Sequence, residues 1–181
     1  MNRLFNPFRY IAGLKSLAFG AIFIIAAALM LYSGGMIQDS YIHVGYADAS
    51  FWYVLAMQVV WWLFPALLLY LCGLLLTKSK IRLIDILGTT AFAQLIMLLL
   101  IAPMLLPVVA DSTAEMMAAL QSGEHPQNGD MIPLLIYGIW TLACLALYYL
   151  WNYNAFAVSC NVSGWKAVVA FIVVQIAVTL A

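Results

Sequence analysis

Long apolar runs separated by short polar segments follow one another along the whole chain. A helix needs about 20 mostly apolar residues to cross the hydrocarbon core of a bilayer, and the runs are of that length. The pattern therefore predicts an all-α polytopic membrane protein, a bundle of five transmembrane helices. The predicted spans are residues 17–37, 51–76, 83–106, 131–151 and 165–181.

The fifth predicted span is the shortest. At about 1.5 Å per residue, residues 165–181 reach roughly 25 Å, which is at the short end of what crosses a bilayer. We expect the span to cross, so that the C-terminus lies outside. If it does not cross, the C-terminus stays on the inner side.

Five crossings sort the charged residues by side. Lys and Arg in short loops stay on the cytoplasmic side, which places the N-terminus inside. The basic residues all fall on that side: Arg3, Arg9, Lys15, Lys78, Lys80, Arg82 and Lys166. The opposite side holds Asp39, Asp48, Asp111, Glu115, Glu124 and Asp130, and Asp85 is the one acidic exception.

Composition agrees with a membrane protein. The chain is 67% hydrophobic and 8% charged, whereas soluble domains are about half apolar and about a quarter charged. The net charge is zero, so nothing indicates a nucleic-acid partner.

The first apolar run is longer than the core of a typical signal peptide, so we interpret it as an uncleaved span. Cys72, Cys144 and Cys160 are expected to be buried thiols without disulfides.

Two segments outside the spans carry structure of their own. Residues 1–16 mix aromatic and basic side chains, which is typical of a segment at the inner membrane surface. Residues 107–130 form the only long polar stretch and are predicted to be an outer loop with a short surface helix. That helix would begin at the capping-box spacing of Ser112 and Glu115 and end near Gly123.

Small residues at helical spacing predict where the spans touch. Helices in lipid associate through close packing of small side chains and through a few polar contacts. Ser16 and Gly20 lie four residues apart at the first span, and Gly88 lies three before Ala91 in the third. These positions are predicted contact seams. An alanine stripe in the fifth span is a further candidate.

A few polar residues inside the spans are candidates for a site. Asp85 is either the ion-pair partner of Arg82 near the inner interface or a functional carboxylate. Gln94 and Gln175 lie deep in the third and fifth spans, and Thr89 shares a helix face with Asp85. Their ordinary role is hydrogen bonding between helices. The functional alternative is a polar site between spans three and five.

No catalytic or metal-binding pattern is present. The sequence contains no G-x-S-x-G, H-E-x-x-H or P-loop motif. His43 and His125, each near carboxylates, are expected to be solvated loop residues, although together they could hold a metal ion. We therefore predict no catalytic residues, no cofactor and no metal.

Three segments carry a family resemblance. They are Asn6-Pro7-Phe8-Arg9, residues 82–94 (RLIDILGTTAFAQ) and residues 155–167 (AFAVSCNVSGWKA). Together they resemble the Yip1 family. The resemblance implies five spans, a cytoplasmic N-terminus and a C-terminus on the far side. The short form resembles bacterial members, which implies a bacterial cytoplasmic (inner) membrane.

The sequence also departs from that family. Eukaryotic members act in vesicle traffic and associate with small GTPases and with each other. The longer N-terminal region with its Asp-Leu-x-Gly-Pro motif is not found here, and Gly88-Thr89 stands where the family has Gly-Tyr. Binding of a GTPase is therefore not carried over.

The expected function is a non-enzymatic scaffold that organises the membrane through lipids, through itself or through other membrane proteins. Lipid headgroups would bind at Lys78, Lys80, Arg82 and Lys166. Span three, with Gly88, Thr89 and Gln94, would be the packing core. The alternative is a transporter or channel that uses Asp85 and Gln94 as its polar site and Pro65 and Pro103 as flexing points. An enzyme is the third possibility.

Overall fold

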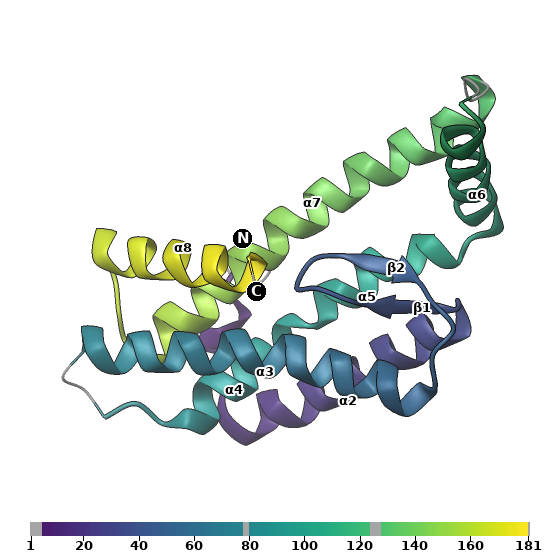
Figure 1. The fold of residues 1–181 in the computed structure, drawn as a ribbon. Coiled ribbons are helices and arrows are strands. Elements are labelled where there is room, and N and C mark those ends of the chain that lie inside the picture. Colours follow the sequence, from purple (N-terminus) through teal and green to yellow (C-terminus); the bar gives the residue numbers. More distant parts are fainter. Residues whose placement is uncertain (1–4, 78–79, 124–127, 181) are drawn as a thin grey trace.

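The computed structural model describes residues 5–77, 80–123 and 128–180, and Figure 1 shows their arrangement. The structure is 80% helical, which confirms the all-α class. Within the described residues, four segments are long and apolar enough to cross a membrane. They are α2 (Gly13–Ser33), α3 (Phe51–Leu76), the broken helix Leu83–Leu105, and Met131–Ser159 within α7 (Asn128–Ser159).

Helix α8 (Trp165–Thr179) has 15 residues, fewer than those four. It packs along α3 and buries a stripe that includes Ala167, Phe171 and Val174. Ala177, one of the alanines of the stripe predicted in the fifth span, lies on the exposed face of α8. The packed face of α8 is therefore built from larger side chains than the predicted alanine stripe. A fifth crossing stays a prediction.

The third predicted span is a helix in pieces. It consists of α4 (Leu83–Ala93), α5 (Leu95–Ile101) and the 3-10 turn η2 (Ala102–Leu105). The interruption between α4 and α5 lies at Gln94. By contrast, α3 continues through Pro65 without a break. The expected flexing point at Pro65 is therefore not an interruption of the helix.

Helices α2 and α4 run side by side in the same direction, and their seam is the predicted one. A Cβ added at Gly20 would overlap Ala91, including its backbone. Ser16 donates a hydrogen bond of 2.8 Å to the carbonyl oxygen of Gly88. Glycine at these positions lets the two backbones approach, and the buried hydroxyl adds a polar contact.

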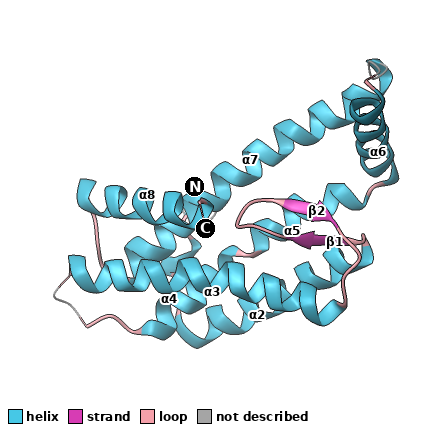
Figure 2. Cartoon of the chain, viewed as in Figure 1, coloured by secondary structure: helices cyan, strands magenta, loops and turns pink. Residues whose placement is uncertain are grey.

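The segment after α2 differs from expectation. The helix ends at Ser33 rather than at residue 37, and Gly35 turns the chain with φ of 61°. The strands β1 (Met36–Gln38) and β2 (Val44–Tyr46) then pair antiparallel. Figure 2 shows this hairpin in magenta among the helices. The stretch between the first two predicted spans therefore contains a β-hairpin, which the sequence analysis did not predict.

Helix α6 (Pro107–Ser122) occupies the predicted outer loop and ends at Gly123, whose φ is 74°. It begins six residues earlier than the capping box suggested, with Leu106 rather than Ser112 as its N-cap and Pro107 in its first turn. Ser112 lies inside the helix and donates a hydrogen bond to the carbonyl oxygen of Val108. Figure 1 shows α6 lying across the far end of α7, which leaves the other helices diagonally.

One end of the molecule gathers the starts of α2, α4 and α8 and the ends of α3 and α7. A Cβ on Gly73 would meet Cys160 and Ile81, and Ser159 contacts Asp85. The described basic side chains belong to this end: Arg9, Lys15, Lys80, Arg82 and Lys166. We call it the basic end.

Candidate functional site

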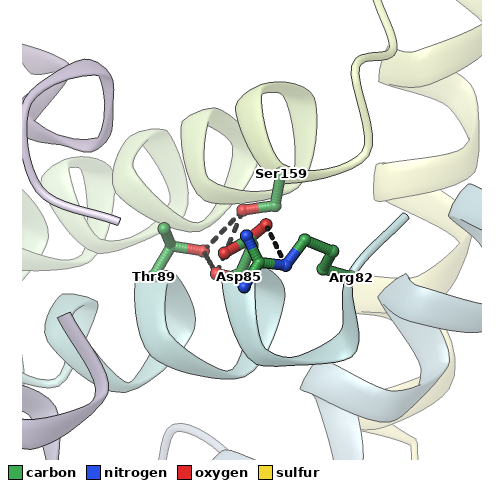
Figure 3. Close-up of polar contacts among 4 residues, drawn as sticks. All are labelled: Arg82, Asp85, Thr89 and Ser159. Atoms are coloured by element: carbon green, nitrogen blue, oxygen red, sulfur yellow. Dashed lines mark hydrogen bonds and ion pairs between the residues drawn. The ribbon is translucent and has the colours of Figure 1, made fainter. Parts of the chain in front are cut away.

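The first candidate site lies at the basic end and joins α4 to the end of α7. Figure 3 shows Arg82, Asp85, Thr89 and Ser159 converging there. Thr89 Oγ1 lies 2.9 Å from Ser159 Oγ and donates to the carbonyl oxygen of Asp85 at 2.8 Å. Ser159 donates to the same carbonyl at 3.2 Å. The hydroxyls thereby fasten the first turn of α4 to α7.

Asp85 has the expected ion-pair partner, at long range. Its carboxylate lies 3.9 Å from Arg82 Nε, and the Arg82 side chain is 76% exposed. A Cβ on Gly13 would lie 3.3 Å from Asp85 Oδ1, so the carboxylate also reaches the first residue of α2. A helix N-terminus favours negative charge. These contacts favour a structural role, in which Asp85 links the starts of two helices.

The second candidate site is a buried polar cluster midway along the helices. Gln94 lies midway between Leu83 and Leu105, and its amide donates a 3.1 Å hydrogen bond to Tyr148 Oη. The Tyr148 ring packs on Tyr41, with ring centroids 5.9 Å apart. Tyr41 lies at the tip of the β1–β2 hairpin. The hairpin therefore reaches the middle of the helical segments.

Glutamines hold the hairpin in this position. Gln58, seven residues inside α3, donates a hydrogen bond to Gln38 Oε1. Gln38 in turn donates to the carbonyl oxygen of Tyr41 at 2.8 Å. Both glutamines are almost fully buried. Because a lost hydrogen bond between buried polar groups is costly, this chain of bonds fixes the tip.

Two side chains of the cluster keep unused hydrogen-bonding capacity. Tyr41 Oη and both polar atoms of Gln175 are buried, and none makes a hydrogen bond within the described residues. Gln175 nevertheless lies close enough to Tyr41 to influence its hydroxyl. Burial raises the pKa of Tyr41 well above its ordinary value, so the phenol is neutral. The cluster offers neutral donors and acceptors rather than charge.

The structure thus divides the predicted polar residues between two places. Asp85, Gly88 and Thr89 belong to the basic end, whereas Gln94 and Gln175 belong to the midway cluster. Of the predicted headgroup residues, Lys80, Arg82 and Lys166 lie at the basic end, and Lys78 lies outside the described residues.

Sequence reasoning missed Gln38, Tyr41, Gln58 and Tyr148 as site residues. Gln58 offered a signal, because it is an isolated amide in the second apolar run. Tyr148 lies near the inner end of the fourth predicted span, where aromatic residues usually face the membrane surface, but it is 2% exposed inside the protein. Tyr41 carried no signal, since its burial depends on the fold of the hairpin.

The described residues contain no group of three His, Cys, Asp or Glu side chains arranged to hold a metal ion. His43 Nδ1 lies 2.6 Å from Asp39 Oδ1 beside the hairpin tip, and His125 lies outside the described residues. Comparison of the chain with protein-family models, curated proteins and solved structures found no match.

Proposed function

We propose that the protein is a non-enzymatic membrane scaffold that organises the bilayer through bound lipids and through other membrane proteins or copies of itself. The resemblance to the Yip1 family and the bacterial cytoplasmic membrane are parts of this proposal. The observation that carries it is the concentration of positive charge at one end of the helices. Lys80, Arg82 and Lys166 lie there around the starts of α4 and α8.

The acidic residues at the other end of the helices support an orientation with the basic end on the cytoplasmic side. Asp48 precedes α3, and Asp111 and Glu115 lie on α6, far from the basic end. Cations on the cytoplasmic side and anions opposite are the usual distribution in membrane proteins. The basic end would therefore face the anionic lipids of the inner leaflet, where each Lys or Arg contributes about 1 kcal/mol.

Much of α7 is left for contact with lipid or protein. Leu135, Ile139 and Leu142 are each more than 60% exposed, on the half of α7 that leaves the other helices. Apolar side chains exposed to this extent are suited to a bilayer or to a partner helix. A scaffold that acts through lipids or other membrane proteins needs such a surface.

The test replaces the three basic residues together. We expect Lys80→Gln, Arg82→Gln and Lys166→Gln to weaken the preference for phosphatidylglycerol over phosphatidylcholine about a hundredfold, at about 1 kcal/mol per cation. Quenching of tryptophan fluorescence by brominated lipids in mixed micelles measures this preference. Trp165 is well placed to report it, because it is 72% exposed beside Lys166.

The matched control changes charge at the opposite end, with Asp48→Asn and Asp111→Asn. It should leave the lipid preference unchanged. An unaltered preference in the triple variant would contradict lipid binding at the basic end.

A second candidate function, passage of a small neutral solute, is favoured by the midway cluster. Tyr41 and Gln175 have polar atoms without partners there, and the neighbouring His43 and Asp39 side chains are more than half exposed. Ionisable groups exposed at this depth require water rather than lipid around them. A water-filled space beside the hairpin would serve a transporter.

Swelling of proteoliposomes in urea or glycerol tests this candidate. A transporter raises permeability above that of protein-free vesicles, and Gln94→Leu is expected to remove most of the increase by disconnecting Tyr148. Gln121→Leu on the exposed face of α6 is the control and should keep it. Permeability equal to that of empty vesicles supports the scaffold alone.

A further inference from the structure

The segment before α2 is anchored to the helices through one aromatic side chain. Phe8, in the 3-10 turn η1 (Pro7–Arg9), is 1% exposed. Its ring meets Phe92 and Trp151 edge to face, with centroid distances of 6.2 and 5.8 Å. Phe8 belongs to the segment that was predicted to lie at the inner membrane surface, but its side chain is buried inside the protein.

Hydrogen bonds with α7 fix the same segment from another side. Asn154 Nδ2 donates to the carbonyl oxygen of Phe5 at 2.8 Å, and Asn6 Nδ2 donates to Asn154 Oδ1 at 3.4 Å. The buried Phe8 and these hydrogen bonds hold the segment in a fixed position beside α7. The space between the segment and α7 is therefore part of the fold.

That space is a cavity of about 260 Å³ lined by Phe5, Asn6, Arg9, Tyr10 and Asn154. Arg9 supplies a positive charge, and none of the lining residues carries a negative one. Asn6 Oδ1 is buried and has no hydrogen-bond partner within the described residues. The cavity therefore offers a cation together with an unused acceptor.

The cavity lies close to the basic end of the molecule. Asn154 is five residues before the end of α7 at Ser159, which is roughly 7–8 Å along a helix axis. Lys15 and Arg82 belong to the same end of the molecule. If this end faces the inner leaflet, phosphate and glycerol groups of lipids lie at this level.

We propose that this cavity binds the headgroup of a phospholipid whose phosphodiester is followed by a hydrogen-bond donor, as in phosphatidylethanolamine. Arg9 binds the phosphate, since guanidinium and phosphate form strong charge-assisted hydrogen bonds. Asn6 Oδ1 accepts a hydrogen bond from the ammonium group. The site deepens the proposed function, because it gives the basic end a selective lipid in addition to general attraction to negative charge.

The choice between two lipids of equal charge tests the proposal. Phosphatidylethanolamine and phosphatidylcholine share the phosphodiester, but the methylated ammonium of the second has no donor. We expect the full chain, purified in mixed micelles of both lipids, to retain phosphatidylethanolamine about tenfold more strongly in native mass spectrometry. Equal retention of the two lipids would overturn the proposal.

Single substitutions of basic residues test whether the lipid binds in this cavity. Arg9→Gln should lose the retained lipid, whereas Arg9→Lys should keep most of it and thereby exclude unfolding as the cause. Lys15→Gln, a neighbouring cation outside the cavity, is the matched control and should behave as the wild type. Equal losses in Arg9→Gln and Lys15→Gln would show that general charge binds the lipid and would refute the site.

The source of the phosphate is decided by competition with soluble glycerophosphoethanolamine. Displacement of the lipid at millimolar concentration shows that the headgroup alone is bound, and resistance shows that the acyl chains are needed. Both results keep the site. The triple variant of Lys80, Arg82 and Lys166 leaves Arg9 intact. If this variant loses the preference for phosphatidylglycerol but still retains phosphatidylethanolamine, the cavity site is independent of the general lipid binding at the basic end.

Discussion

Replacing Gly20 with alanine is expected to destabilise the protein by about 1–3 kcal/mol, a large effect for one methyl group. The added Cβ would overlap the backbone of Ala91 and Phe92. A flexible side chain could move aside, but a helix backbone can do so only if the two helices separate. We therefore expect α2 and α4 to lose their closest contact.

Gly88→Ala should act in the same direction, because its Cβ would overlap the carbonyl oxygen of Gly13. Gly138→Ala is the matched control, since Gly138 also lies within a helix but has no atom within 4 Å of the added Cβ. Alanine there should be neutral or stabilise by about 0.5–1 kcal/mol. Thermal unfolding of the purified variants in detergent measures all three, and equal melting temperatures would refute the seam.

This seam was predictable from the sequence because its cause is local. Helices packed in lipid approach closely where small residues repeat along one face, and Ser16, Gly20, Gly88 and Ala91 show that repeat. The bounds of α3 were predictable for a similar reason. Ser50 caps its start, and the polar residues at Thr77 and beyond end the apolar run.

The hairpin was not predictable, because its position is decided by distant partners. Each strand has only three residues, too few for an alternating pattern to stand out. Nothing in residues 38–46 distinguishes a solvated loop from a segment that folds back among helices. The deciding contact is the bond from Gln58, which follows Gln38 by 20 residues.

The interruption at Gln94 was also not predictable from the local sequence. Prolines are the usual breakers of helices, yet α3 contains Pro65 without interruption. The third predicted span instead breaks at a glutamine, between α4 and α5. At that point the Gln94 side chain bonds with Tyr148 on α7, and Trp140 on the same helix donates to the carbonyl oxygen of Leu99. Contacts with α7 therefore accompany the change in helix geometry, and a local pattern cannot contain them.

Tyr41→Ala is expected to destabilise the protein by about 3 kcal/mol, because it empties the space that the buried ring fills at the hairpin tip. The ring is 1% exposed and packs against Tyr148, whose hydroxyl receives the Gln94 bond. Losing the ring should therefore release the hairpin and loosen the polar cluster. Thermal unfolding in detergent, followed by tryptophan fluorescence, measures the change.

Tyr41→Phe separates the ring from its hydroxyl. The hydroxyl has no hydrogen-bond partner within the described residues, so its removal should alter stability by less than about 1 kcal/mol in either direction. If Tyr41→Phe instead destabilises the protein as much as Tyr41→Ala, the hydroxyl must have a partner supplied by water or a bound solute. That outcome would favour the transport function over the scaffold.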